Sequence, residues 1–273
     1  MRLRVTVRLR LYNFMLPRED LLKQVENRET MARVIDQADQ AIKTWEVVTT
    51  DFLSPPEIAE VQKVFSQLAE VHAISWGGYP QAERQRLAIS RSELPLDPTQ
   101  IELAALEIAG NFLFDPATHR DFLGALLGTG IVRDKVGDII VLGERGGQVI
   151  AAPELVDFLT ASLTQVRSVP VKTRRIDLSE LKIREPKKKE LVTVEASMRL
   201  DAISSAGFGM SRSKMVDLIS AGDVRVNWKD ISSTSYAVKS GDLIAVSGKG
   251  RVEVGEVMIT KKDRYRVQLT RFV

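Results

Sequence analysis

The sequence predicts an α+β protein with more than one domain, and three observations point to this class. The chain has 273 residues, enough for two or three domains that each bury a core of their own. Over residues 15–70, apolar side chains recur at the three- and four-residue spacing of amphipathic helices. From residue 71 onward, short alternating runs typical of strands are mixed with helical stretches.

The first region, residues 15–70, is predicted to be helical. Ser54-Pro55-Pro56-Glu57 combines an N-cap, a proline suited to a first helical turn and a capping-box glutamate, so a helix should begin there. We interpret the aromatic members of the stripes, Trp45 and Phe65, as core residues. The stripes consist of Met31, Val34, Ile35, Ala38, Ala41, Ile42 and Trp45, followed by Ile58, Val61, Phe65 and Leu68.

Composition excludes several classes of protein. There is no cysteine and there are only two histidines, which excludes disulfides and argues against a usual zinc site. No apolar run reaches the roughly 18 residues of a membrane span. Residues 1–14 alternate arginine with apolar residues and lack the apolar core of a secretory signal. We interpret them as a basic or non-native extension, with Met15 as an alternative start to Met1. For the protein as a whole, we expect a cytoplasmic monomer that needs no cofactor.

The middle region, residues 71–176, is predicted to form a compact sandwich of helices and strands. Two of its strands should be joined through the hairpin-type turn Glu144–Gly147. The expected elements are strands at 72–76, 86–90, 138–142 and 148–151, helices at 99–109, 116–127 and 153–163, and an extended segment at 166–176.

A charged segment, DLSELKIREPKKKE at residues 177–190, is predicted to be a linker. Charge is distributed unevenly around it. Residues 1–164 carry 17 Lys+Arg against 23 Asp+Glu, whereas residues 165–273 carry 22 against 13. An acidic body joined to a basic end is the pattern expected when one part of a protein meets a polyanion.

The last region, residues 191–273, should contain two short helices followed by strands. We expect a helix at 198–206, a turn at 207–210 and a second helix at 212–220 with Ser211 as its N-cap. Gly222 should end that helix. Val224, Val226 and Trp228 alternate with polar residues as in a half-buried strand, and a further strand is expected at 243–246.

Cations at the start of the second helix make it a candidate phosphate site. Arg212 and Lys214 oppose the helix dipole there, so their presence favours an anionic partner that also meets the free N–H groups. The alternative is that each cation is simply solvated. Because both lie off the apolar stripe, their removal should affect binding more than stability. The candidates from this reasoning are Arg199, Ser211, Arg212, Ser213, Lys214, Arg225 and Lys229, with Lys249 and Arg251 in a second basic turn.

These residues also carry a resemblance. The run RLDAISSAGFGMSRSKMVDLISAGDVRVNW, followed by AVKSGDLIAVSGKGR, resembles the S4 RNA-binding domain, whose pattern also includes Asn227. Trp228 stands where this family usually has glycine. The resemblance implies binding of structured RNA, chiefly ribosomal or transfer RNA, through the two helices and the strand and loop that follow.

The preceding part is similar to the bacterial YlmH-like proteins in GGYPQAERQRL (77–87) and HRDFLGALLGTGIVRDKVGDIIV (119–141). That resemblance implies an RRM-like middle domain and a role on the large ribosomal subunit in rescue of stalled translation. Its cyanobacterial and plastid branch carries the label "photosystem II S4 domain protein", which gives one alternative function, an interaction protein for photosystem II assembly or repair. No aromatic RNP signature is visible, so the acidic body could instead contact proteins. Secondary RNA-contact candidates are Arg84, Arg86, His119, Arg120, Arg133 and Lys135.

Three short motifs raise an enzymatic alternative, an RNA-modifying enzyme targeted by its S4 domain. His119-Arg120-Asp121 is similar to a kinase catalytic loop but lacks the glycine-rich loop and the other kinase motifs. Arg199-Leu200-Asp201 is similar to the aspartate motif of pseudouridine synthases, and Gly128-Thr129-Gly130 to a methyltransferase loop. We favour non-catalytic binding, with Asp201 on the helix surface or paired with a nearby arginine.

Overall fold

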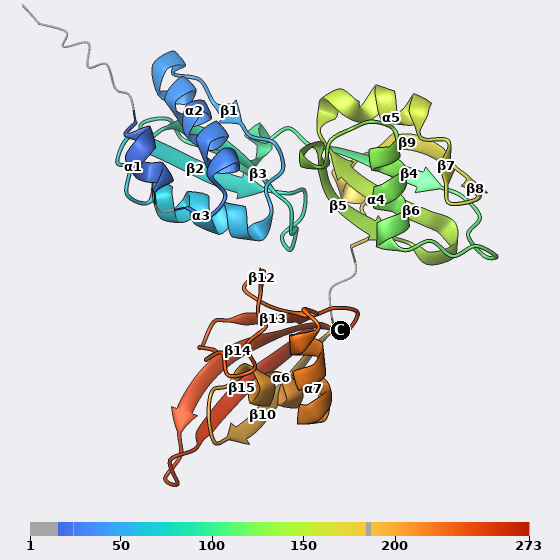
Figure 1. Ribbon diagram of the computed structural model, residues 1–273. Coiled ribbons are helices and arrows are strands. Elements are labelled where there is room, and N and C mark those ends of the chain that lie inside the picture. Colours follow the sequence, from blue (N-terminus) through green and yellow to red (C-terminus); the bar gives the residue numbers. More distant parts are fainter. Residues whose placement is uncertain (1–15, 24, 184–186, 273) are drawn as a thin grey trace, which may run out of the picture. The chain divides into compact units, whose positions relative to one another are not determined.

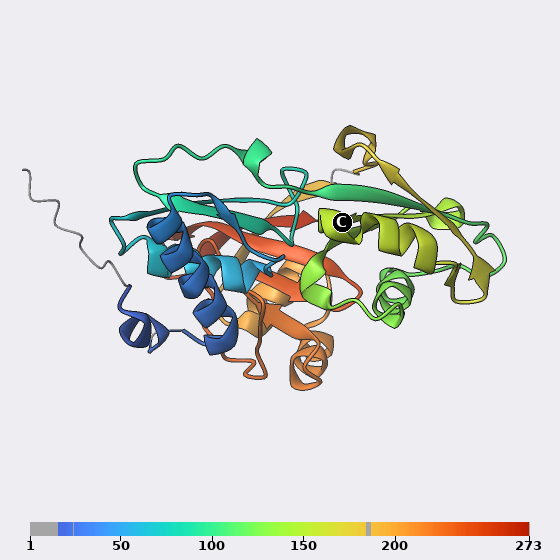
Figure 2. The same ribbon diagram turned by 90° about the horizontal axis from the view of Figure 1, so that it is seen from above.

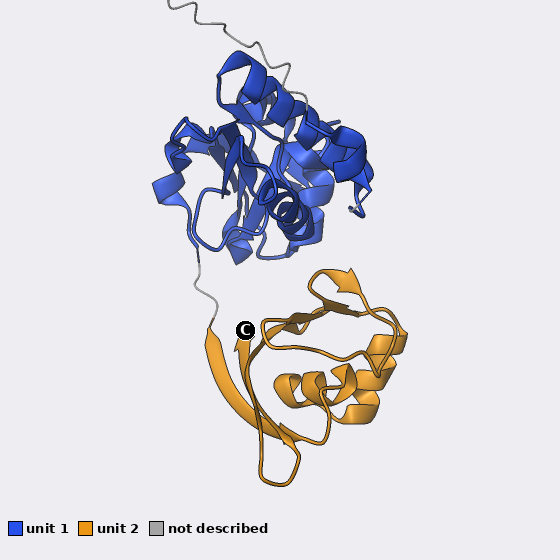
Figure 3. Cartoon of the chain, turned by 90° about the vertical axis from the view of Figure 1, so that its left-hand side faces the viewer, with its two compact units in different colours: residues 1–183 blue, residues 184–273 orange. Residues whose placement is uncertain are grey.

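The computed structural model describes residues 16–23, 25–183 and 187–272. It divides the chain into two units, residues 1–183 and 184–273, which Figure 3 shows in different colours. The basic extension expected at residues 1–14 lies outside the described residues. No helix in the described ranges is both long and apolar enough to cross a membrane.

The N-terminal part of the first unit is a small antiparallel sheet covered by helices. Its sheet has the order β1-β3-β2, and Figure 2 shows α2 and α3 on the same side of it. The capping box expected at Ser54 and Glu57 is present at the start of α3. The elements are α1 (Arg18–Leu22), α2 (Arg28–Thr44), β1 (Val48–Thr49), α3 (Pro55–Phe65), β2 (Val71–Trp76) and β3 (Arg86–Arg91).

One hydrophobic core joins these helices to these strands, so the expected division at residue 70/71 does not separate two bodies. Ile35 of α2 and Ile89 of β3 are fully buried members of the same cluster. Strand β2 contributes to this core together with the helices, because α3 packs against it. The prediction for Phe65 is confirmed, but that for Trp45 is wrong. Trp45 ends α2 in a left-handed conformation, and 56% of its surface is exposed.

The middle domain has the βαββαβ order and the sheet order β5-β6-β4-β9, which is the arrangement of an RRM-like fold. Helices α4 and α5 pack against one face of the sheet (Figure 1). The elements are β4 (Ala104–Ala109), α4 (His119–Gly128), β5 (Val136–Val141), β6 (Gly146–Ala151), α5 (Val156–Ser162) and β9 (Lys172–Ile176), with a short hairpin of β7 (Gln165–Val166) and β8 (Val169–Pro170).

The helix expected at 99–109 is wrong, because its second half is the central strand β4. This strand pairs with both β6 and β9, and Ala105 and Leu106, on opposite faces, are both buried. A strand buried on both faces shows no two-residue alternation, so its pattern can be mistaken for a helical one. Of three nearby phenylalanines, Phe112 and Phe122 are buried in the core of this domain, whereas Phe114 is 89% exposed.

Gly146 begins β6 at φ +110°, and a Cβ at this position would lie 2.0 Å from the carbonyl oxygen of Ile108. The obstacle is a backbone atom, so no side-chain rotation can make room for the added methyl group. Gly146→Ala should therefore destabilise the first unit by about 2 kcal/mol or more in urea unfolding.

The matched control is Gly124→Ala in α4, where nothing lies within 4 Å of the added Cβ. Alanine favours the helix over glycine by up to about 1 kcal/mol. This variant should therefore be neutral or more stable than the parent. Equal stability of the two variants would contradict the backbone contact described at Gly146.

The second unit is a six-stranded antiparallel sheet of order β10-β15-β14-β13-β11-β12, with α6 packed on the sheet and α7 packed against α6 (Figure 1). Gly207, expected in a turn, lies inside α6, where its close approach to Val252 leaves no room for a side chain. The elements are β10 (Lys188–Glu195), α6 (Leu200–Phe208), α7 (Arg212–Ser220), β11 (Val224–Val226), β12 (Lys229–Asp230), β13 (Leu243–Val246), β14 (Gly250–Ile259) and β15 (Tyr265–Phe272).

The segment 177–190 is not a continuous linker. Its first part packs on the middle domain, where the side-chain amide of Gln148 binds both the Glu180 carbonyl and the Lys182 N–H. Its last part, from Lys188, belongs to β10 and pairs with β15. Charge alone suggested a linker, but the backbone hydrogen bonds of both ends are satisfied by neighbouring elements.

Candidate RNA-binding surface

The first turns of α6 and α7 meet at Asp201, a carboxylate whose side chain is only 5% exposed. Arg199, the residue before α6, donates to it from Nε at 3.1 Å and from Nη2 at 3.2 Å. Arg212, the first residue of α7, donates from Nε at 3.1 Å and from Nη2 at 3.0 Å. The prediction that Asp201 pairs with a nearby arginine is confirmed, and the alternative of a helix-surface residue is wrong.

This arrangement changes the interpretation of Arg212. Its guanidinium group helps to bury Asp201, so its removal should affect stability as well as binding, contrary to the expectation from the apolar stripe. Its side chain is still 57% exposed, and Nη1 has no acceptor among the described residues. Arg212 can therefore position the two helices and present an outward N–H group at the same time.

The pKa of Asp201 gives a pH test of this contact. Burial alone would raise the pKa of Asp201, but the hydrogen bonds and charges of Arg199 and Arg212 lower it below its usual value. A carboxylate with a lowered folded-state pKa stabilises the fold above its unfolded pKa of about 3.9, and this stability is lost as pH falls through the folded value.

Asp201→Asn should therefore reduce the free energy of unfolding of the second unit at pH 7. The difference from the parent should shrink once pH falls below about 4. Urea unfolding across this range measures it. A difference that stays constant down to the lowest pH would show that the ionised carboxylate does not contribute to stability.

The start of α7 has the predicted N-cap. The Ser211 side chain accepts a hydrogen bond from the Lys214 N–H at 3.4 Å and lies 3.2 Å from the Ser213 hydroxyl. Lys214 is exposed, and its ammonium group has no partner in the described part of the chain. A free cation thus lies beside first-turn N–H groups that have no acceptor within the helix.

Strand β11 ends two residues earlier than predicted, in a tight hairpin to β12. Asn227 and Trp228 form its turn at φ 48° and 69°. Asn227 accepts from Leu243 N at 2.9 Å and donates to Asp242 at 2.8 Å, so its side chain fixes this turn instead of remaining free for RNA. The positive φ of Trp228 explains why S4 domains usually have glycine there.

Basic side chains border the hairpin. Arg225 forms an exposed ion pair with Asp230 at 2.7 Å, which solvent makes weak and exchangeable. The guanidinium group of Arg251 lies 5.7 Å from the centre of the Trp228 ring. Lys229 on β12 and Lys249 in the turn before β14 are both exposed.

One basic turn of this unit was not predicted from the sequence. Lys261, Lys262 and Arg264 are exposed in the turn between β14 and β15. The signal was present in the sequence, because KKDR stands between two alternating runs and therefore marks the tip of a hairpin.

Two of the secondary candidates, Arg84 and Arg86, are structural. Arg84 donates to the Phe52 carbonyl at 2.7 Å and to the Val136 carbonyl at 3.1 Å, which ties the N-terminal sheet to the middle domain. Arg86 is buried and binds the Thr50 carbonyl at 2.6 Å. Burial lowers the pKa of both guanidinium groups, although nearby carboxylates oppose the shift. Arg86 is thus buried, and the side chain of Arg84 is only 14% exposed.

Arg133 and Lys135 are also committed to contacts within the first unit. Arg133 binds the Val136 and Gly137 carbonyls, and burial together with the charge of Arg84 lowers its pKa to about 10. Lys135 lies between Asp51 at 2.7 Å and Glu154 at 2.9 Å. Of these interactions, the one between Lys135 and Asp51 links the N-terminal part to the middle domain.

His119 and Arg120 remain exposed at the start of α4. Asp121, the third residue of the kinase-like motif, completes a capping box with Thr118 and pairs with Arg167. The motif is therefore a helix start. Of the six secondary candidates, only these two keep accessible side chains without a partner in the described residues.

The face on which RRM domains stack bases is covered here. Gln148 on β6 is 1% exposed because residues 177–182 cross its face of the sheet. Glu107 on the neighbouring β4 is paired with Arg174 at 2.6 Å. This explains the missing aromatic signature, because aromatic side chains there could not reach a base.

The chain thus combines an RRM-like domain with a unit of two helices on a sheet, whose helix starts and hairpins carry basic side chains. This combination defines a class of multidomain RNA-binding proteins. Residues 26–94 match the family described as "YlmH, N-terminal", residues 97–180 match "Putative RNA-binding domain in YlmH", and residues 198–244 match the S4 domain. The chain belongs to the YlmH family.

One curated relative supports this assignment, and one solved structure shares the fold. The chain is 36% identical over 223 residues to "Ribosome-associated protein quality control protein P2" of Bacillus subtilis, an alignment covering 81% of this chain and 86% of that protein. The solved structure "Cell division protein ylmH from Streptococcus pneumoniae" shares the fold with a TM-score of 0.50 at 20% identity, over 59% of this chain and 96% of that one.

Proposed function

We propose that this protein binds structured ribosomal or transfer RNA through its S4 unit, on the large ribosomal subunit, and acts there in quality control of translation without catalysing a reaction. The observation that carries the proposal is the start of α7, where the Lys214 ammonium group has no partner among the described residues, lies beside the first-turn N–H groups of the helix, and is accompanied by Arg212 Nη1. Such an arrangement favours phosphate oxygens.

Further cations extend the proposed contact surface. Exposed lysines stand on the β11–β12 hairpin and in the two following turns, and an RNA backbone offers a phosphate at every nucleotide. We place the phosphate contacts at Arg199, Ser211, Arg212, Ser213, Lys214, Arg225, Lys229, Lys249 and Arg251, and add Lys261, Lys262 and Arg264. Asn227 supports the surface through the turn that it fixes.

The ribosomal setting is supported by the relative whose name places it in ribosome-associated quality control. We further propose that the protein is cytoplasmic and works as a monomer on its ribosomal partner. His119 and Arg120 are the remaining candidates for an RNA contact by the first unit.

The test is crosslinking of the full chain to RNA in cells, followed by sequencing of the bound RNA and by sucrose-gradient fractionation. We expect large-subunit ribosomal RNA or transfer RNA, and comigration with ribosomal fractions. The variant Lys214→Ala should reduce both signals, whereas Lys63→Ala, an exposed lysine on α3 in the first unit, should not.

The same experiment separates the alternatives. A modifying enzyme would leave a changed nucleotide near the crosslink, and a photosystem II assembly protein would migrate away from ribosomes. Either result, with no ribosomal RNA recovered, would contradict the proposal.

A further inference from the structure

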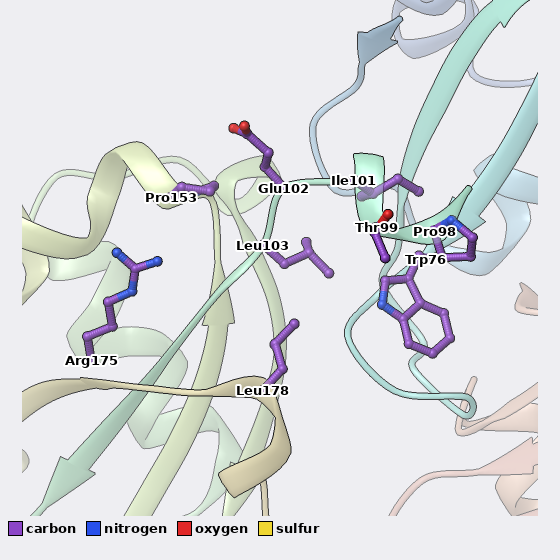
Figure 4. Close-up of a pocket in the computed structure, with 9 residues that line it drawn as sticks. All are labelled: Trp76, Pro98, Thr99, Ile101, Glu102, Leu103, Pro153, Arg175 and Leu178. Atoms are coloured by element: carbon purple, nitrogen blue, oxygen red, sulfur yellow. The ribbon is translucent and has the colours of Figure 1, made fainter. Parts of the chain in front are cut away.

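A pocket of about 580 Å³ lies in the first unit where the N-terminal sheet meets the middle domain. Figure 4 shows Trp76, the last residue of β2, at one end and Arg175 of β9 at the other, with Leu103 and Leu178 between them. Its volume lies in the range of small-molecule sites. It is separate from the S4 unit, so it is a different site from the one proposed above.

Three of the polar side chains that line it lack hydrogen-bond and ion-pair partners among the described residues. The Trp76 indole is half-buried, and its N–H donates no hydrogen bond to any described residue. Arg175 and the Glu102 carboxylate, which also lines the pocket, are exposed and form no ion pair with the described residues. An indole, a guanidinium group and a carboxylate therefore line one pocket and are available to contact a ligand.

Neighbouring residues of the same types show the contrast. Arg174, next to Arg175, is paired with Glu107 at 2.6 Å and with Glu180 at 3.9 Å. Trp45 is covered by the guanidinium group of Arg91, 3.9 Å from the centre of its ring. Trp228 has Arg251 near its ring. Trp76 alone among the three tryptophans has no cation recorded over its ring in the described chain.

We propose that this pocket binds a single-stranded RNA segment, with one unpaired base stacked on Trp76 and a phosphate at Arg175. An indole offers a plane on which any base can stack, and arginine suits phosphate. Glu102 accepts hydrogen bonds from base N–H groups. The RRM-like sheet face is covered by residues 177–182, and the pocket beside it supplies an aromatic plane in its place.

The test is a fluorescence-anisotropy titration of the full chain with a labelled single-stranded RNA hexanucleotide that cannot pair with itself. Trp76→Ala should weaken binding about 5- to 150-fold, the range for loss of one base–aromatic stack. Trp76→Phe keeps an aromatic plane and should bind within a few-fold of the parent. Arg175→Ala should weaken binding and reduce its salt dependence.

Two matched controls make the result specific. Trp45→Ala removes a tryptophan of the same unit outside the pocket, and Lys63→Ala removes an exposed lysine of α3 outside the pocket, so both should bind the hexanucleotide like the parent. If Trp76→Ala does not fold, Arg175→Ala decides, since the side chain of Arg175 is exposed and has no ion-pair partner among the described residues. Absence of saturable binding by the parent, or parent-like binding by Arg175→Ala and any folded Trp76→Ala, would overturn the proposal.

Discussion

Replacing both Arg199 and Arg212 by methionine is expected to destabilise the second unit by about 3–5 kcal/mol, the cost of leaving the buried Asp201 carboxylate without compensation. Each arginine donates two hydrogen bonds to Asp201, whose side chain is 5% exposed. Each single substitution should cost less than half of this, because the other arginine still pairs with the carboxylate. Urea unfolding measures the three variants.

The control for this prediction is a third substitution. Adding Asp201→Asn to the double variant removes the uncompensated charge and should restore much of the lost stability. If the triple variant is as unstable as the double one, the loss comes from packing of the arginine side chains and not from the buried carboxylate.

The second large effect is expected on removal of the S4 unit. A chain ending at Ile183 should lose affinity for a structured RNA hairpin by two orders of magnitude or more, because the exposed cations of α7 and the following turns are removed together. The remaining unit should stay folded, since its two hydrophobic clusters contain no residue beyond Val171. Circular dichroism and a gel-shift titration measure both properties.

The converse fragment completes this test. Residues 184–273 have a core of their own and should keep most of the affinity for the hairpin. If residues 1–183 bind the hairpin and residues 184–273 do not, the structured-RNA site lies in the first unit, which would contradict the proposal.

Much of the second unit could be predicted from local sequence signals. Ser211 caps α7, Gly222 has the positive φ expected after a helix, and Gly241 marks a turn. These positions depend on neighbouring residues alone. The end of β11 was missed because Trp228 alternates with Val224 and Val226, yet a two-residue turn places it at φ 69°. Only the pairing with β12 reveals this turn.

The errors in the first unit share a tertiary cause. Arg84 and Arg86 were predicted as candidate RNA contacts, but carbonyl groups distant along the chain accept hydrogen bonds from them. The strand β4 looks helical because it is buried on both faces. Trp45 continues an apolar stripe, but the helix ends at it, so its ring leaves the core. In each case, the burial of the residue depends on which distant elements pack against it, and the local sequence does not contain this information.

The salt dependence of RNA binding tests the central proposal most directly. The affinity of the parent for one RNA hairpin should fall linearly on a log–log plot against salt concentration, with a slope set by the number of phosphates contacted. Lys214→Ala should reduce that slope by about one unit and weaken binding equally across hairpin sequences. Its stability should be unchanged, because Lys214 has no partner in the described structure. An unchanged slope and affinity for this variant would show that the start of α7 is not the RNA site.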